Sequence, residues 1–464
     1  MGDPFFLATV CVCALAGTAV GFLTGLVPGL HMNNIAALLS AYAASTLSAF
    51  GSLSTALGSA SPRVSIASFL VAALTAHTFA ESVPSTYVGI PAGDVVSVLP
   101  AHRLAKAGLG RAAVRAAADG VLSGVLVSAV LLVPACFLMG GPIGIYEVLR
   151  DFMGLIVILV SCLLIASEGS RAVSGRSRSR LLGLARGAIL FAASGLLGCV
   201  VLKSRFYCCP VPDLPWMPGG FTPRESLLLP MFAGLFGVPS LVLSLGSRQV
   251  FDLSAASHCV HLHRPSAKDL LLSLFGGTVV GWMPGMTSGA AATLCAPSMR
   301  ETVCQSDIPA SLRFIWLYSS ISGSGAVFSL GALFAIMRAR SGTMDAAEMF
   351  LDGRIDGSVW SSNLPFLLPL VLAMILAALV AHSLLRLLES RIRTVRDVMG
   401  SRTAALSALA FVVTLSIALT GTRGAVVLVT SAMLGLIPPL VGVRRIQLMG
   451  CLLVPIAVSL LGSA

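Results

Sequence analysis

The chain has 464 residues, of which 56% are hydrophobic and 11% are charged, and its formal net charge at pH 7 is +11. A soluble protein carries about 25% charged residues, so the composition excludes a soluble globular chain and indicates a multi-pass protein of the cytoplasmic membrane. The arginines gather in short segments between apolar runs, which is typical of cytoplasmic loops, and no basic face or motif for nucleic acid accompanies them.

The first apolar run, residues 5–27, stops at Pro28-Gly29, and a second run resumes over residues 34–50. This pattern predicts two short helices that face each other across a break. The first residues contain Asp3 and no basic side chain, which favours a retained membrane segment over a cleaved signal peptide.

Residues 62–80 are apolar, and the stretch from Glu81 to Gly108 is rich in proline and glycine, which do not continue a helix. Apolar segments follow at 112–139, 143–166, 181–202 and 226–246. Lengths near 20 residues suit a hydrocarbon core of about 30 Å.

A polar stretch, residues 247–268, is predicted to be a cytoplasmic linker between two transmembrane repeats, residues 1–246 and 269–464. The second repeat starts with a broken segment at 270–296. An apolar segment at 311–337, a polar stretch at 338–360, and apolar segments at 361–384, 403–421, 424–441 and 446–462 then follow.

The same motif, Gly-x-x-x-Gly-x-x-Pro-Gly, occurs at Gly21–Gly29 and again at Gly277–Gly285. Breaks at matching places in two halves are the sequence pattern of a transporter binding site. Irregular backbone survives at membrane depth only inside protein or beside a water-filled cavity, so the two breaks predict a cavity between the halves.

The orientation of the repeats follows from the positive charges. If the loop Arg171–Arg180 and the segment 386–402 are cytoplasmic, counting spans places residues 103–115 and 247–268 inside and residues 338–360 outside. The two broken segments then start on opposite sides, provided that each returns to the side on which it starts. We therefore expect an all-α integral membrane protein of two inverted-topology repeats, each with a re-entrant helical hairpin and about five transmembrane helices.

A helix that begins after a break offers free N–H groups and the positive end of its dipole to an anion. The tips contain no Lys or Arg, so the expected ligand is a carboxylate or phosphate held by neutral donors. The other interpretation is that the glycines and serines only allow tight helix packing. The residues expected to bind substrate are Gly25, Pro28, Gly29, His31, Asn33, Asn34, Gly281, Pro284, Gly285, Thr287, Ser288 and Gly289.

Energy for transport is expected from a sodium or proton gradient, because no phosphate-binding loop and no catalytic motif is present. Glu81 and Asp94 are the candidates for ion coupling, and the alternative for both is a solvated loop charge. His31 is a candidate proton or substrate partner, or a packing residue. The run His258-Cys259-x-His261-x-His263 matches no standard zinc spacing, so neither a metal site nor a cofactor is expected.

The paired motifs resemble the large membrane subunit of tripartite tricarboxylate transporters, the TctA-like family. Pro84–Pro91 and Leu99–Gly108 look like the loop after the first break in that family, and Ile321–Gly325 with Arg340–Gly342 look like the matching region of its archaeal branch. The resemblance implies a secondary transporter of organic anions, classically citrate-like carboxylates. In bacteria, family members work with a small membrane subunit and an extracytoplasmic solute-binding protein. The chain departs from the bacterial pattern after Pro91, and at the first break, where His31-Met32-Asn33-Asn34 replaces a glycine-rich run.

The expected function is therefore gradient-driven transport of small organic anions through a lipid bilayer. Transport is expected to occur by movement of one group of helices against another. The sequence is compatible with a monomer and with a homo-oligomer. An alternative is a flippase for a lipid phosphate, because Pro284–Gly289 resembles the Pro-Gly-x-Ser-Gly-Gly run of polyprenyl-phosphate translocases. A membrane enzyme acting on lipids is a further alternative, and it would need a cluster of acids or histidines around the cavity.

Overall fold

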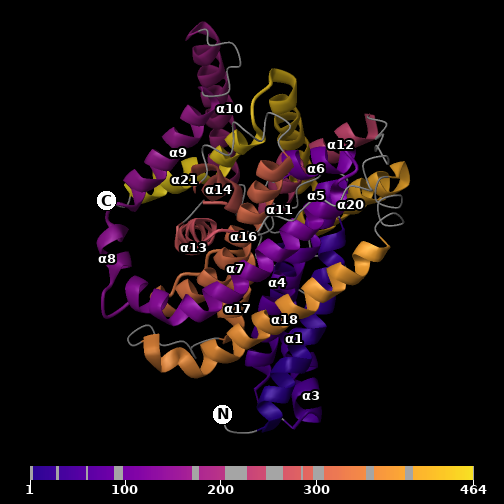
Figure 1. Ribbon diagram of the computed structural model, residues 1–464, viewed down its shortest axis with the longest axis vertical. Coiled ribbons are helices and arrows are strands. Elements are labelled where there is room, and N and C mark those ends of the chain that lie inside the picture. Colours follow the sequence, from indigo (N-terminus) through magenta and orange to yellow (C-terminus); the bar gives the residue numbers. More distant parts are fainter. Residues whose placement is uncertain are drawn as a thin grey trace. The chain divides into compact units, whose positions relative to one another are not determined.

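The computed structural model describes residues 4–27, 31–58, 61–87, 98–169, 177–203, 227–246, 265–283, 286–295, 308–351, 360–391 and 401–462, and all regular structure within these ranges is helical (Figure 1). Seven of the described helices are long and apolar enough to cross a membrane, and four shorter apolar helices accompany them. The prediction of an all-α membrane protein is confirmed.

The chain forms two compact units, and neither coincides with one predicted repeat. Unit 1 comprises Met1–Ala92, Ser97–Tyr146 and Arg248–Ala404, and unit 2 comprises Gly93–Val96, Glu147–Ser247 and Ala405–Ala464. Each unit therefore combines helices from both halves of the sequence. The division into inverted repeats 1–246 and 269–464 stays a prediction.

The first half of unit 1 is built around α1 (Pro4–Leu26) and α4 (Pro62–Ala80), which pack along each other. Glycines of α1 allow this approach, since a Cβ on Gly21 would overlap the carbonyl oxygen of Ala73 in α4. The other helices of this half are α2 (Met32–Ala41), α3 (Ala43–Ala56), α5 (Ser82–Tyr87), α6 (Val98–Lys106) and α7 (Gly110–Met139).

Two short helices lie in the stretch 81–108 that the prolines and glycines predicted to be irregular. Pro84 falls in the first turn of α5, where its missing N–H would have no partner within the helix, so proline is compatible with helix there. That part of the prediction was wrong because position within a helix, and not proline content alone, decides whether the helix forms.

The second half of unit 1 repeats this packing. Its elements are α13 (Ala267–Trp282), α14 (Ser288–Cys295), α16 (Ile308–Ile336), α17 (Gly342–Leu351), the 3₁₀ turn η4 (Trp360–Asn363) and α18 (Leu364–Ser390). Helix α13 packs on α16 as α1 packs on α4, and a Cβ on Gly281 would lie 2.6 Å from Cβ of Phe328. At its start, the buried Asp269 accepts hydrogen bonds from Arg313 of α16 at 2.6 and 2.8 Å.

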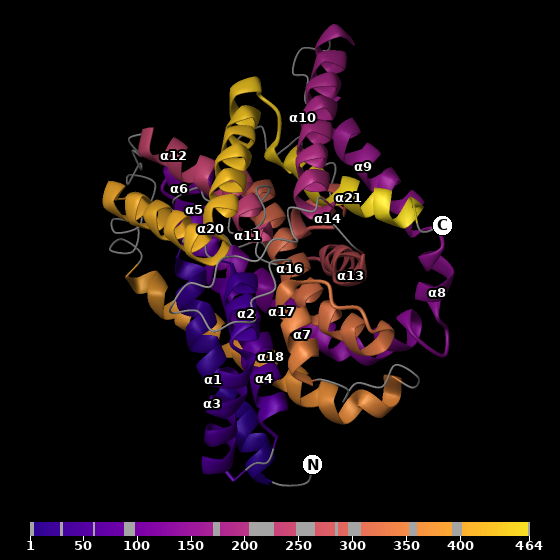
Figure 2. The ribbon, with the colours of Figure 1, turned by 180° about the vertical axis from the view of Figure 1, so that it is seen from behind.

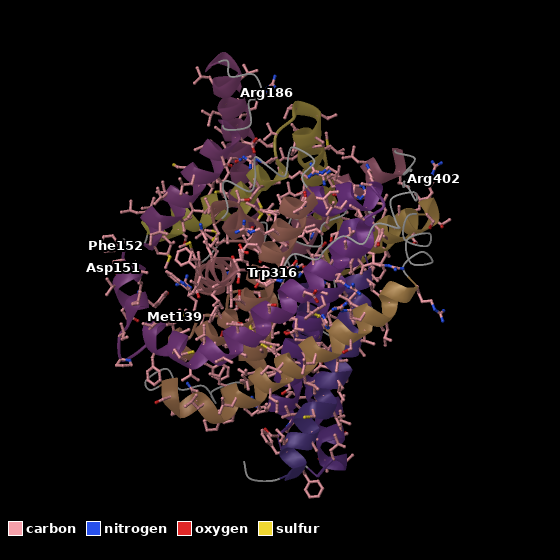
Figure 3. All side chains as sticks on the ribbon, viewed as in Figure 1. Met139, Asp151, Phe152, Arg186, Trp316 and Arg402 are labelled. Carbon is pink, nitrogen blue, oxygen red and sulfur yellow. The ribbon has the colours of Figure 1, made fainter. Side chains whose placement is uncertain are left out.

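The core of unit 1 joins the two halves of the sequence. Helix α16 packs along α7, and α4 packs along α18. Trp316 of α16 is fully buried and is labelled in Figure 3 among the side chains of this region. A Cβ on Gly120 of α7 would lie 2.5 Å from the carbonyl oxygen of Trp316, so α7 and α16 are in close backbone contact.

Unit 2 contains α9 (Met153–Gly169), α10 (Ser177–Lys203), α11 (Leu228–Phe232), the π-helical turn η2 (Ala233–Gly237), α12 (Val238–Gly246), α20 (Arg402–Val441), the 3₁₀ turn η5 (Arg445–Met449) and α21 (Gly450–Leu461). The short α8 (Ile145–Arg150) spans the boundary between the units. Within α20, Gly421 has φ +63°, which separates the two spans predicted at 403–421 and 424–441.

Candidate functional site

The first break lies between α1, which ends at Leu26, and α2, which begins at Met32. Pro28 and Gly29 lie outside the described residues. His31 has an extended backbone, and its Nδ1 accepts a hydrogen bond of 3.2 Å from the backbone N–H of Asn33. His31 therefore caps the N-terminus of α2, and its expected contact with substrate or proton stays a prediction.

Asn33 connects the first break to α17. Its Oδ1 accepts hydrogen bonds from the backbone N–H of Thr343 at 3.2 Å and from the Thr343 hydroxyl at 3.0 Å. A Cβ on Gly342 would lie 3.3 Å from Cβ of Asn33, so the starts of α2 and α17 are in contact (Figure 2). Asn34 lies in the first turn of α2, and its side chain is outside the described part of the chain.

The second break lies between α13, which ends at Trp282, and α14, which begins at Ser288. Pro284 and Gly285 are outside the described residues. The Thr287 hydroxyl accepts a hydrogen bond of 3.2 Å from the N–H of Ala290 and caps α14, as His31 caps α2. Gly289 is buried in the first turn of α14.

Arg340 contacts the second break from the segment between α16 and α17. Its Nε donates a hydrogen bond of 3.2 Å to the carbonyl of Met283, the residue after α13. Thr343, which bonds Asn33 at the first break, follows three residues later. Three residues span at most about 11 Å between Cα atoms, so one short segment of unit 1 touches both breaks.

Arg340 is the functional candidate that the sequence reasoning missed. It is partly buried, and no carboxylate in the described part of the chain forms an ion pair with it. Burial lowers its pKa to about 10, which still leaves the guanidinium charged at pH 7. Because Arg340 is distant in sequence from both breaks, inspection of the tips found only neutral donors. The signal present was Arg340-Ser341-Gly342 within the family resemblance.

The motif glycines next to the breaks have a packing role in the structure. A Cβ on Gly25 would lie 2.7 Å from the His77 carbonyl oxygen and from the Ala80 Cβ of α4, and Gly281 faces Phe328 of α16. Tight packing thus accounts for glycine at both positions. Whether Gly25 and Gly281 also touch substrate stays a prediction.

One of the two candidates for ion coupling lies beside the first break. Glu81 follows α4, and its Oε2 is 3.9 Å from Nε2 of His77. The His77 ring lies 5.6 Å from the ring of His31, measured between centroids. Asp94, the other candidate, lies outside the described residues.

No group of three or more metal-binding side chains occurs in the described ranges. The run from His258 to His263 falls outside them. The expectation that the chain holds no metal therefore stays a prediction.

Comparison with known proteins identifies the family. The model of the tripartite tricarboxylate transporter TctA family matches residues 11–450. An uncharacterized protein of Methanocaldococcus jannaschii, MJ1079, is similar to this chain, with 28% identity over 336 residues that cover 72% of the chain and 71% of the relative. No solved structure matches. The family match covers nearly the whole chain, so this multi-pass membrane protein belongs to the tripartite tricarboxylate transporter TctA family and is a transporter component, not an enzyme.

Proposed function

We propose that the protein is a secondary transporter that carries small organic anions bearing carboxylates, bound at the two helix breaks of unit 1. The observation that carries this proposal is the segment Arg340–Thr343, which bonds Met283 at one break and Asn33 at the other. It brings a cationic guanidinium with no carboxylate partner among the described residues to the region where helices begin.

The chemistry of this region suits a carboxylate. Helix α2 and α17 start in contact with each other, and α14 starts shortly after Met283, so three helix N-termini lie near the segment. Their dipoles and free N–H groups favour anions. A guanidinium binds a carboxylate through paired hydrogen bonds, which a point charge does not reproduce. An anion with two or more carboxylates can use Arg340 and the helix ends together.

The substrate contacts proposed here are the tip residues Pro28, Gly29, His31, Asn33, Asn34, Pro284, Gly285, Thr287, Ser288 and Gly289, with Arg340 added. A sodium or proton gradient supplies the energy. Because the family forms tripartite transporters, the proposal includes a small membrane subunit, an extracytoplasmic solute-binding protein and the cytoplasmic membrane. The family match favours this function over a polyprenyl-phosphate flippase.

Uptake into proteoliposomes tests the proposal. Purified protein, alone and together with the small membrane subunit and the solute-binding protein, is reconstituted and offered labelled citrate, simple dicarboxylates or a short-chain polyprenyl phosphate under imposed sodium or proton gradients. We expect uptake of a carboxylate that depends on a gradient. Arg340→Gln should abolish this uptake. Arg340→Lys keeps the positive charge but lacks the paired N–H donors of the guanidinium, and it should retain part of the uptake.

Arg150→Gln is the matched control, because Arg150 is exposed and its ion pair with Glu147 lies at the surface. This variant should transport as the wild type does. Uptake of no carboxylate under any gradient, or an Arg340→Gln variant as active as the Arg150→Gln control, would count against the proposal.

A further inference from the structure

A buried histidine of α4 faces the first break with one ring nitrogen unused. The Thr24 hydroxyl donates its single proton to the Gly21 carbonyl at 3.0 Å, and its oxygen lies 3.2 Å from Nδ1 of His77. When the hydroxyl keeps its bond to Gly21, Nδ1 carries a proton and donates it to Thr24, because the hydroxyl has no second proton to give. The lone pair of the neutral ring is then on Nε2. That atom is buried and has no hydrogen-bond partner among the described residues.

We infer that His77 is the group that binds the coupling proton, with Glu81 as its carboxylate partner, in the anion transport proposed above, on which this inference rests. Nε2 of His77 and Oε2 of Glu81 are 3.9 Å apart, within the range of an ion pair once the ring is charged. One proton from the water on one side bonds to the Nε2 lone pair and converts imidazole to imidazolium. The same proton returns to water on the other side, so each cycle moves one proton and leaves His77 unchanged.

The charges around His77 are consistent with a single carboxylate partner. His31, the cap of α2, has its ring centroid 5.6 Å away, and its Nδ1 is already used by Asn33. From α18, His382 stacks edge-on against Phe79 and pairs with Asp119 of α7 at 2.9 Å. The remaining acidic groups on helices packed against α4 are Asp345 and Glu348 of α17 and Glu389 near the end of α18, and the nearby turns of α1 and α16 carry no titratable side chain.

Among the described residues, the second break has no comparable titratable group on the helix that packs against it. Where α4 faces Gly25 it carries His77, and where α16 faces Gly281 it carries Phe328. The helices that precede the two breaks pack alike through their glycines, and the packing partners differ in the side chain at this position. The structure therefore assigns proton coupling to the first break, beside the tip residues that contact the substrate.

The test separates substrate exchange from proton coupling. Wild-type protein and His77→Gln are reconstituted in proteoliposomes, and two rates are measured with the labelled carboxylate that the wild type accepts. Exchange between labelled and unlabelled substrate needs no net proton movement, and His77→Gln should retain it. Accumulation driven by a proton gradient, followed together with acidification of the interior by a trapped pH-sensitive dye, should be lost in this variant.

Two further variants test the carboxylate partner of His77 and provide a control histidine. Glu81→Gln should weaken proton-driven accumulation and spare exchange, which tests the pair even if His77→Gln does not insert. His382→Gln changes a histidine that already has a carboxylate partner, and it should keep the response to the gradient. A His77→Gln protein that still accumulates substrate in response to the proton gradient, or a wild type that responds only to sodium, would overturn the inference and leave anion transport intact. Absence of any uptake by the wild type would instead contradict the proposed function.

Discussion

At the scale of the residue, Asn33 offers a way to change charge at the proposed anion site without changing the fold. Its Oδ1 accepts two hydrogen bonds from Thr343, and a carboxylate oxygen accepts the same two bonds. Asn33→Asp should therefore fold as the wild type does, with the added charge favoured at the start of α17. The same charge repels an anionic substrate, and we expect KM for uptake to rise by about tenfold, which corresponds to about 1.4 kcal/mol.

The companion variant Asn33→Ala separates charge from contact. It removes both bonds to Thr343, so the free energy of unfolding should fall by about 1 kcal/mol for each hydrogen bond lost. The thermal midpoint of the detergent-solubilised protein should fall with it. An Asn33→Asp protein with unchanged KM would show that substrate binds away from this tip. A lower thermal midpoint for Asn33→Asp than for Asn33→Ala would show that the contact to α17 does not stabilise the fold.

The residues of the site were predictable only where they adjoin the breaks in sequence. His31 and Thr287 stand where a capping side chain is required, so the pattern of each tip indicated them. Arg340 and Thr343 reach the breaks from the end of α16 through the fold. Nothing in the local sequence shows which break a residue more than 50 positions away will contact. The pairing of Thr24 with His77 is hidden for the same reason.

At the scale of the element, the contact between α1 and α4 depends on glycine. A Cβ on Gly21 would overlap the backbone of α4, whereas a Cβ on Gly51 of α3 would meet no atom within 4 Å. Gly21→Ala should destabilise the protein by about 1–3 kcal/mol through overpacking. Gly51→Ala should be neutral or stabilising by up to about 1 kcal/mol, because alanine is the better helix former.

Thermal unfolding of the two variants in detergent measures this difference, and both substitutions add the same methyl group to a helix. Equal midpoints for Gly21→Ala and Gly51→Ala would mean that α1 and α4 are not in close contact. Residual uptake by Gly21→Ala would further show whether the spacing of α1 and α4, which positions Thr24 beside His77, matters for coupling.

Hydrophobic runs predicted most of the helices but not their partners. The runs at 62–80 and 112–139 became α4 and α7 within two residues at each end. Residues 338–360 were predicted as a polar stretch outside the membrane, and α17 buries Met344, Ala347 and Phe350 there. The stretch as a whole looks polar because charged residues flank α17 on both sides and its own apolar residues surround Asp345 and Glu348. Only its contacts with α2 and α4 reveal the face that packs.

At the scale of the whole molecule, the two halves of the sequence are interleaved within each unit. In unit 1, α7 packs on α16, and α18 packs on α4. The carboxylate of Asp119 in α7 also accepts a hydrogen bond from His382 of α18. In unit 2, the buried Glu168 of α9 accepts a hydrogen bond of 2.7 Å from Nε of Arg444, in the last segment of the chain. Removing one partner of a buried pair leaves an uncompensated charge, so each half needs the other to fold.

This interleaving predicts how the chain behaves when it is cut in the predicted linker, between residues 255 and 256. Expressed alone, residues 1–255 should fail to give a monodisperse protein in detergent, because α4, α7 and α9 lose their packing partners and Glu168 loses Arg444. Residues 256–464 should fail for the same reason. Co-expressed, the two fragments should co-purify through a tag on either one and recover a single elution peak.

The control introduces Glu168→Gln into fragment 1–255 and Arg444→Met into fragment 256–464, each expressed alone. Removing both charges relieves the unpaired ion but restores none of the lost helix contacts, so the fragments should still fail alone. A stable, monodisperse fragment 1–255 would mean that the first repeat folds as an independent domain.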